Sequence, residues 1–353
     1  MKKLLVFVLA GMTGVAGMST AIAGTATCDT EALRRELSRE AKACPREMLN
    51  FVIGYNPGGN TYTLGNGFIA YLRRVAGDAS FNVSMEAKPG ASGEIASRFV
   101  ADLDAREAGC QVLVAQSNQL TTNRIGLPNP VDPTKDLVPI ALLGESPLVV
   151  TINPGRTSAR SIEAWANYLR AAKGDERQDF YGSNGNYATD HLATERLMDA
   201  IGANATHVPF TGSAPMILSL ASTSQQQIDF GLLALGLIGG YLADGRLVGL
   251  AVAQKDDVRI PRKGQDDLVI PSIQRIAPDF QASIWVALAG GRHMPASLGR
   301  ALERATECFA ADKASRDTYT GELMFTLGGG RSELIHRMKV ETAEASRIFV
   351  AKQ

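Results

Sequence analysis

Two glycine-containing turns, each between an expected strand and an expected helix, are the segments of this chain best suited to chemistry. The first covers residues 55–61 (YNPGGNT) and the second covers residues 88–93 (KPGASG). Glycine permits a sharp turn and leaves the backbone amides accessible to a ligand. The start of a helix adds unpaired N–H groups and a partial positive charge. Two such helix starts side by side predict an anion site that needs no Arg or Lys.

The elements around these turns alternate between strand and helix. The pattern predicts strands at 49–54, 81–86, 111–115, 147–152, 178–182, 205–209, 227–232, 247–253 and 283–288. It predicts helices at 30–43, 63–76, 93–103, 160–172, 190–201, 214–222, 236–244, 296–310 and 331–349. Alternation of this kind indicates an α/β chain with parallel, doubly wound sheets. Ligands bind beyond the carboxyl ends of the strands in such sheets, which is where both turns lie.

The N-terminus has the features of a secretory signal peptide. Two lysines at 2–3 precede an apolar run over 4–15, and residues 21–23 (AIA) form a typical cleavage site. The alternative is a membrane anchor, but the run is short for a span of about 20 residues. We therefore expect removal of residues 1–23, export to the periplasm and no further membrane segment.

Charge and length narrow the function classes. Removing residues 1–23 leaves 330 residues with 34 basic and 36 acidic side chains, a net charge of −2. This balance argues against a nucleic-acid or anionic-membrane partner. The length fits two lobes better than one core. No Walker or dinucleotide motif is present, and the histidines show no metal-ligand spacing, so neither a cofactor nor a metal is expected.

Three segments resemble the signature segments of the tripartite tricarboxylate transporter substrate-binding proteins, also called the Bug or TctC-like family. They are 55–59 (YNPGG), 88–93 (KPGASG) and 207–215 (HVPFTGSAP), of which the third is the most specific. The resemblance extends from about residue 48 to residue 330. It implies a two-lobed periplasmic binding protein of type II, a Venus flytrap that closes on a small organic carboxylate in the cleft between its lobes. It also implies a monomeric, non-enzymatic receptor that delivers this ligand to inner-membrane transporter subunits.

The resemblance implies that the two glycine turns hold the carboxylate nearest lobe one. Tyr55 is either an aromatic lid or a core residue at the strand end. The polar residues that follow the strand at 111–115 either reach the cleft or form an ordinary turn. The contacts expected from lobe one are Tyr55, Gly58, Gly59, Asn60, Thr61, Ala91, Ser92, Gly93, Gln116, Ser117 and Asn118.

Lobe two offers two small-residue loops before helices and one apolar strand end. Their polar residues either grip the far end of a ligand or only cap the helices that follow. The contacts expected from lobe two are Ser183, Asn184, Asn186, Thr211, Gly212, Ser213, Leu233 and Ala234.

Two positions depart from the family pattern. An acidic residue is common in the family a few positions after the first turn, where this chain has Tyr62. A polar pair is common where this chain has Leu233 and Ala234. Together with Tyr187, these departures predict a pocket for a carboxylate with a hydrophobic or aromatic body.

The lobe boundaries are placed where apolar stretches cross between sheets. Residues 147–153 and 247–253 are the expected crossings, and a polar loop of about 17 residues follows the second. Lobe one is then 24–149 plus 254–353, and lobe two is 150–253. The family places its hinge at such crossings.

The cysteines predict two disulfides in an oxidising compartment, and the alternative is four reduced, buried thiols. A helix over 30–43 spans roughly 20 Å, so Cys28 and Cys44 lie too far apart to pair. Cys44 precedes the first strand and Cys110 directly precedes the third. These strands are parallel neighbours in a flavodoxin-like sheet, so their starts lie at one edge. We therefore predict Cys44–Cys110, which leaves Cys28 to pair with Cys308.

Two other functions fit parts of the pattern. A receptor of the same fold can report its ligand to a signalling partner, and the sequence does not separate this role from transport. A secreted hydrolase is the other alternative, because Ser183, Asp190 and His191 lie close together in sequence. No G-x-S-x-G elbow is present, and adjacent residues on one helix do not aim at each other. The sequence therefore favours a receptor over an enzyme.

Overall fold

The computed structural model describes residues 28–77, 81–171, 179–222, 228–322 and 325–351. The predicted signal peptide lies outside these residues. Within them, no helix combines the length and the apolar character that a membrane span requires.

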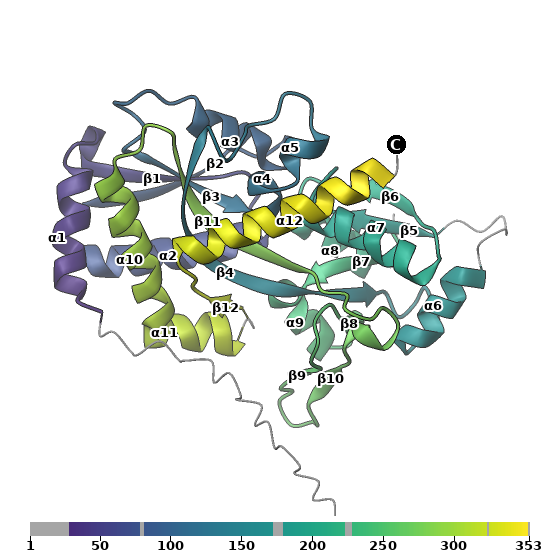
Figure 1. Ribbon diagram of the computed structural model, residues 1–353. Helices are drawn as coiled ribbons and strands as arrows, with labels where there is room; N and C mark the ends of the chain where they lie inside the picture. Colours follow the sequence, from purple (N-terminus) through teal and green to yellow (C-terminus); the bar gives the residue numbers. More distant parts are fainter. Residues whose placement is uncertain (1–27, 78–80, 172–178, 223–227, 323–324, 352–353) are drawn as a thin grey trace, which may run out of the picture.

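A mixed ten-stranded sheet runs through the molecule, in the order β2-β1-β3-β11-β4-β7-β5-β6, with β12 and β8 also paired to β4 (Figure 1). The strands β1 to β3 are parallel, as are β5 to β7, whereas β11 and β4 run against their neighbours. The strands are β1 (Met48–Ile53), β2 (Asn82–Ala87), β3 (Gln111–Gln116), β4 (Leu137–Ile152), β5 (Phe180–Ser183), β6 (Thr206–Pro209), β7 (Phe230–Ala234), β8 (Val248–Val252), β11 (Ser283–Gly291) and β12 (Thr326–Leu327).

The long strand β4 joins the two halves of this sheet. It pairs with β11 over residues 137–147 and with β7 over residues 148–152. The backbone N–H of Leu148 donates to Ala282, and the N–H of Ala253 donates to Leu148. The crossing segments predicted from the sequence meet at this point. The lobe boundaries themselves stay a prediction.

The sequence missed part of this crossing region. Residues 137–146, which no predicted strand covered, form the first part of β4 and include Pro139, which has no N–H to donate. The segment after β8 was expected to be a loop, but it holds a hairpin of β9 (Val258–Ile260) and β10 (Leu268–Ile270). Short strands with one buried residue each leave little periodic signal.

Helices cover the sheet, and their apolar stripes supply its core. On α2, Leu64, Phe68, Ile69 and Leu72 are all buried, as the pattern predicted. The helices are α1 (Thr30–Ala41), α2 (Asn60–Ala76), α3 (Glu94–Ala101), α4 (Ser117–Leu120), α5 (Asn123–Gly126), α6 (Ile162–Ala171), α7 (Thr189–Ile201), α8 (Ser213–Ala221), α9 (Leu235–Ala243), α10 (Ala296–Ala311), α11 (Lys313–Ser315) and α12 (Arg331–Ala351).

Each half of the sheet has an apolar cluster on either face. In the first half, Phe68 of α2 packs edge-on against Phe51 of β1 and Phe309 of α10. In the second half, Trp165 of α6 packs edge-on against Phe230 of β7. Each half therefore has its own hydrophobic core.

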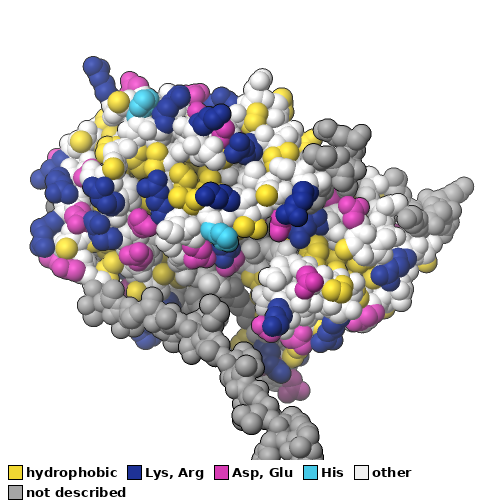
Figure 2. Space-filling view, viewed as in Figure 1, with side chains coloured by type: hydrophobic (Ala, Val, Ile, Leu, Met, Phe, Trp, Pro, Cys, Tyr) yellow, Lys and Arg dark blue, Asp and Glu magenta, His cyan; other side chains and the backbone are white. Residues whose placement is uncertain are grey.

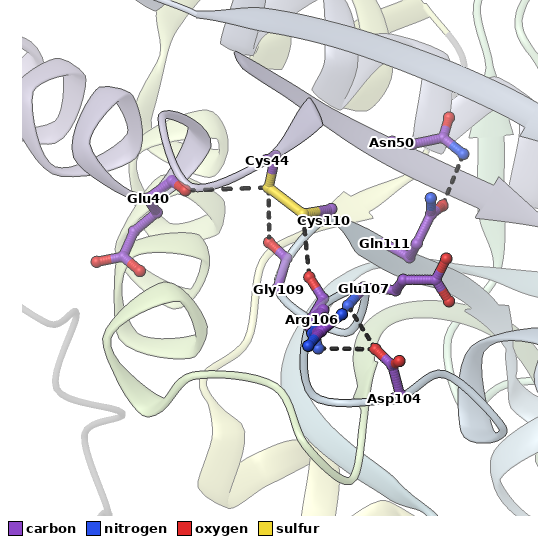
Figure 3. Close-up of a disulfide and its surroundings, with 9 residues drawn as sticks. All are labelled: Glu40, Cys44, Asn50, Asp104, Arg106, Glu107, Gly109, Cys110 and Gln111. Carbon is purple, nitrogen blue, oxygen red and sulfur yellow. Dashed lines mark hydrogen bonds between the residues drawn. A yellow bond between two sulfur atoms is a disulfide. The ribbon is translucent and has the colours of Figure 1, made fainter. Parts of the chain in front are cut away.

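The two disulfides tie the N-terminal segment to the first half. They join Cys28 to Cys308 and Cys44 to Cys110, the pairs predicted from the sequence. Figure 3 shows the second bridge at the entry to β1 and β3, beside the hydrogen bond between the side chains of Asn50 and Gln111. The parallel pairing of β1 with β3 brings these two strand starts together.

The C-terminal helix α12 lies across both halves (Figure 1). Both guanidinium nitrogens of Arg337 donate to Glu145 of β4, at 2.5 and 2.7 Å. Further along α12, the Trp285 indole of β11 donates to Glu341 at 2.5 Å, and Glu344 lies 3.9 Å from Arg196 of α7. The helix therefore contacts the first half through Glu145 and the second half through Arg196.

Candidate functional site

The two glycine turns lie side by side at the carboxyl ends of β1 and β2. Gly54 and Gly93 are so close that a Cβ added at Gly54 would lie 2.7 Å from the Cα of Gly93. Gly58, Gly90 and Gly93 have φ values of 91°, 128° and 85°, which side chains rarely adopt. Ser92 also has a positive φ, 54°. This backbone conformation lets the two turns lie within contact distance of each other.

The helices that follow these turns begin without a side-chain cap. Gly59 precedes α2 and Gly93 precedes α3, and neither supplies a capping side chain. At the start of α2, the backbone N–H of Thr63 donates to the carbonyl of Gly59. Within the described residues, the first amides of α2 therefore have no side-chain cap from Gly59 and lie at the positive end of the helix dipole, as an anion site requires.

The residues after β3 join the same site through a buried polar network. The hydroxyl of Tyr55 lies 2.9 Å from Oδ1 of Asn118 and 3.0 Å from the carbonyl of Ser92. The Asn118 amide donates to the same carbonyl at 2.7 Å, and Thr61 donates to Gln116 at 3.3 Å. Tyr55 is only 5% exposed and packs in the core, which favours the core interpretation over the lid.

In lobe two, the loops after β5 and β6 are hydrogen-bonded to each other. The hydroxyl of Ser213 donates to Oδ1 of Asn184 at 3.0 Å, and the Asn184 N–H donates to Asp190 at 2.9 Å. The hydroxyl of Ser183 is hydrogen-bonded to Nε2 of His207 at 2.6 Å. The predicted polar residues of these two loops therefore position one another.

Loops from the two halves touch directly. The hydroxyl of Ser92 donates to the carbonyl of Asn186 at 2.7 Å. A Cβ at Gly59 would lie 3.8 Å from the hydroxyl oxygen of Ser213, and a Cβ at Gly58 would lie 3.1 Å from the Cβ of Ala214. The structure therefore describes the closed arrangement of these loops.

Further closure contacts pair residues that the sequence singled out, Ser117 and Tyr187, with residues that it did not. The hydroxyls of Ser117 and Thr189 are hydrogen-bonded at 2.6 Å. The hydroxyl of Thr122 donates to the carbonyl of Tyr187 at 2.7 Å, and the Tyr187 ring packs against Gly126. Thr122 and Gly126 lie in short helical turns after β3 and carry no recognisable motif, so only the fold reveals them.

The carboxylate of Asp190 is the main charged group that the sequence did not assign to the site. It is fully buried at the start of α7. Burial raises its pKa to about 7, against the lowering effect of hydrogen bonds from the backbone N–H groups of Asn184, Asp190 and His191. Burial also raises the pKa of Tyr55, and the charge of Asp190 raises it further, so the two groups interact across the lobes. An acidic residue at a helix start after a polar loop was the available signal.

Some predicted residues lie apart from these contacts. Leu233 and Ala234 are buried in apolar clusters on the two faces of β7. Thr211 and Ala91 are exposed. Their roles as ligand contacts stay predictions.

The cation nearest these turns in sequence is held elsewhere. The ammonium of Lys88 is 2.6 Å from Glu86 and lies 4.2 Å from the centre of the Phe99 ring. The donors at the turns themselves are therefore neutral, and their role as an anion site stays a prediction.

The suspected triad does not assemble. Ser183 bonds to His207, while Nδ1 of His191 accepts the backbone N–H of Tyr187. The His191 and His207 rings stack with centroids 3.9 Å apart. Across the described ranges, no group of three or more His, Cys, Asp or Glu side chains is placed to hold a metal ion.

A separate cleft of about 590 Å³ lies between β4, α7 and α12. Its lining includes Arg196, Arg337 and Glu341, together with Thr122 and Thr189 from the closure contacts. Positively and negatively charged side chains are interspersed on the face of the molecule that α12 crosses (Figure 2). This cleft therefore borders the closure contacts but is not formed by the glycine turns.

Comparison with known proteins assigns the family. Residues 74–323 match the family model of the tripartite tricarboxylate transporter family receptor. The chain belongs to this family. This confirms the family resemblance, and the matched residues include the second and third sequence segments. The family consists of receptors rather than enzymes.

Individual relatives agree with this assignment. The receptor is 24% identical to protein BugT of Bordetella pertussis over 256 residues, which cover 70% of this chain and 72% of BugT. It is similar to R. palustris Rpa4515 solved with adipate (TM-score 0.74, 22% identity, 85% of this chain and 95% of that one). It is also similar to MatC of Rhodopseudomonas palustris solved with malate (TM-score 0.72, 18% identity, 85% and 98%). These likenesses show the two-lobed binding-protein fold.

Proposed function

We propose that this protein is a periplasmic receptor that captures a small organic carboxylate between its lobes and delivers it to the membrane subunits of a tripartite transporter. The observation that carries the proposal is the convergence of two uncapped helix starts, at Asn60 and Glu94, with the lobe-two loops at 183–186 and 211–213. The adipate and malate in two structures of the same fold support the ligand class.

The geometry suits reversible capture of an anion. Backbone N–H groups at a helix start bind a carboxylate through partial charges that need no counter-ion. Because donors come from both lobes, neither lobe completes the site, and the ligand favours the closed form by the affinity it gains there. A receptor that must release its cargo benefits from such neutral donors, since no ion pair has to be broken.

The proposed location in the periplasm rests on the predicted signal peptide and the cysteines. A signal peptide over 1–23 directs the chain to an oxidising compartment, where two disulfides form and persist. We infer a monomer with lobe one at 24–149 plus 254–353 and lobe two at 150–253.

A thermal-shift screen of carboxylates against the purified mature chain tests this function. The panel includes adipate, malate, succinate and benzoate, each paired with its uncharged amide. A ligand at one hundred times its Kd stabilises the native state by about 2.7 kcal/mol, so a carboxylate that binds raises the unfolding midpoint and its amide does not. Absence of binding by every carboxylate, or equal binding by the amides, would contradict the proposal.

A further inference from the structure

The cleft of about 590 Å³ lies where the chain crosses between the two halves of the sheet. Its lining includes Pro147, Ala253 and Ala282 of the crossing segments. The backbone N–H of Leu148 donates to Ala282, and the N–H of Ala253 donates to Leu148. A cleft at such a crossing changes shape when the two halves move relative to each other.

One wall of this cleft is a single face of α7. The lining residues of this helix recur at spacings of three and four, which places them on one side of it. They are Thr189, Leu192, Ala193 and Arg196. Thr189 is also hydrogen-bonded to Ser117 of the first half at 2.6 Å. Any movement that parts these two hydroxyls carries Arg196 with it, because Thr189 and Arg196 lie on one helix.

A second wall is a single face of α12, with the same spacing. Its lining residues are Arg337, Val340, Glu341, Glu344 and Ala345. Two of them fasten the helix to the first half of the sheet, because Arg337 donates to both oxygens of Glu145 and Glu341 accepts from Trp285. Glu344 follows one turn later on the same face, where α12 reaches α7 (Figure 1).

Arg196 and Glu344 form an ion pair between these two walls. Their closest atoms, Nη1 and Oε2, lie 3.9 Å apart, and the two side chains are 32% and 44% exposed. The second half of the sheet positions Arg196, whose guanidinium lies 5.1 Å from the centre of the Phe280 ring in the core of that half. Each member of the pair is therefore held by its own half.

An ion pair beside a cleft is a contact that can form and break. Interlocked apolar side chains resist separation, because parting them exposes apolar surface to water. A partly exposed ion pair separates at small cost, because water solvates both charges once they part. The pair between α7 and α12 therefore suits two halves that close on a ligand and open again to release it.

We propose, building on the receptor function, that Arg196 and Glu344 are positioning residues for ligand capture. They act as a clasp at the crossing of the two halves, and they stabilise the closed arrangement without touching the ligand. The ligand closes the halves at the glycine turns, and closure brings Arg196 to the carboxylate that α12 holds in place. Since ligand binding is linked to closure, the contribution of the clasp to the closed form appears in the ligand affinity.

The affinity and dissociation rate of a carboxylate test the clasp. The probe is the tightest binder among adipate, malate, succinate and benzoate. Arg196→Gln and Glu344→Gln each remove one charge, and we expect each to lower affinity about 2- to 5-fold, mainly through faster dissociation. The double variant should lose no more than either single variant, because one shared contact is removed in all three. Arg196→Lys keeps the charge and should bind within about twofold of wild type.

Arg304→Gln is the matched control. Arg304 of α10 forms an ion pair with Glu36 of α1 inside the first half, and its side chain is 46% exposed. This variant removes an ion pair of similar exposure and leaves the contact between the halves intact, so its affinity should equal that of wild type. In about 1 M NaCl, which screens exposed charges, the difference between Arg196→Gln and wild type should shrink. Circular dichroism confirms that each variant is folded.

Spin labels measure whether α7 approaches α12 when the ligand binds. Ala200 on α7, Arg347 on α12 and Arg300 on α10 are exposed. Labels on Ala200→Cys with Arg347→Cys should move closer together when the carboxylate is added. Labels on Arg300→Cys with Arg347→Cys should keep their distance, because α10 and α12 both pack on the first half.

The outcomes separate the clasp from the function on which it rests. If none of the four carboxylates binds, the receptor function fails, and the clasp fails with it. If the wild type binds and both charge-removing variants bind as tightly, the receptor function stands and the clasp is wrong. Additive losses in the double variant, or a distance between positions 200 and 347 that ignores the ligand, also overturn the clasp.

Discussion

The hydroxyl of Ser92 donates a 2.7 Å hydrogen bond to the backbone carbonyl of Asn186, which joins two loops that lie 94 residues apart in the chain. Ser92 belongs to the second glycine turn, and Asn186 belongs to the loop before α7. Together with the hydrogen bond between Ser117 and Thr189, this bond holds the two halves together beside the proposed ligand site. A ligand that bridges the same loops stabilises the state in which these bonds exist.

Removal of the Ser92 hydroxyl should weaken ligand binding without unfolding the protein. Ser92→Ala loses one bond of the closed form, worth about 0.5–1.5 kcal/mol, so we expect a loss of about 2- to 12-fold in affinity by calorimetry. The neighbouring Ala91 already adopts a φ of 47°, so the backbone accepts alanine here. Ser346→Ala on α12, whose hydroxyl bonds only within its helix, is the control. Equal affinities in both variants would contradict a role for this bond in closure.

A side chain at Gly126 should oppose closure. A Cβ there would lie 2.1 Å from the Tyr187 ring, so Gly126→Ala forces the ring and its loop away from lobe one. We expect affinity to fall by roughly tenfold or more, and small-angle scattering at saturating ligand to show a smaller decrease in radius of gyration than in the wild type.

Two further variants make this test specific. Gly126→Ala combined with Tyr187→Ala removes the clash and should restore closure. Gly239→Ala on α9, with no neighbouring atom within 4 Å, should behave as wild type. A radius of gyration that does not change with ligand in the wild type would show that the lobes do not close.

The glycine turns should matter more for binding than the nearby lysine. A side chain at Gly93 would meet Gln119 at 2.6 Å, and a branched side chain at Gly59 would extend into the space toward Ser213, whose hydroxyl lies 3.8 Å from the added Cβ. Gly93→Val and Gly59→Val should abolish carboxylate binding in calorimetry. Lys88→Ala should keep most of it, because the ammonium pairs with Glu86. Full loss in Lys88→Ala with intact binding in Gly59→Val would refute a neutral-donor site.

The sequence predicted those features whose signal lies within a few neighbouring residues. The stripe on α2 and the turns at 55–61 and 88–93 were predictable, because periodicity and glycine chemistry act over a few residues. The pairing of Cys44 with Cys110 was predictable because it needed only the order of neighbouring strands. In contrast, the contact of Thr122 with Tyr187 depends on how the two lobes meet, which no local pattern encodes.

The site shows the same limit. The sequence singled out Asp190 only as a neighbour of Ser183 and His191, since its charge is ordinary for the first turn of a helix. Its full burial arises from how the elements pack around it, which no local pattern encodes. Leu233 and Ala234 illustrate the reverse case, because their apolar character also suits the core in which they are buried.

Reduction of the disulfides should lower stability and leave binding intact. The bridge between Cys28 and Cys308 closes a loop of 280 residues and fastens α1 to α10, far from the glycine turns. A Cys28→Ser, Cys308→Ser variant should lose about 2–5 kcal/mol of unfolding free energy in urea titrations. Its ligand affinity at low temperature should match the wild type. A large affinity loss in the folded variant would place this bridge in the function of the cleft.

The stability of the protein should depend on pH through Glu341. Burial raises the pKa of this carboxyl to about 7, while the bond from Trp285 and the charge of Arg337 lower it. A carboxyl whose folded pKa lies above its unfolded value adds stability below the unfolded pKa, and this contribution is lost as pH rises through about 7. Glu341→Gln keeps an acceptor for the indole and removes the charge. We therefore expect the variant to be about 1–3 kcal/mol more stable than wild type at about pH 8, and no more stable at about pH 4. Thermal unfolding of both proteins across this range measures the difference, which would be flat with pH if the carboxyl titrated normally in the folded state.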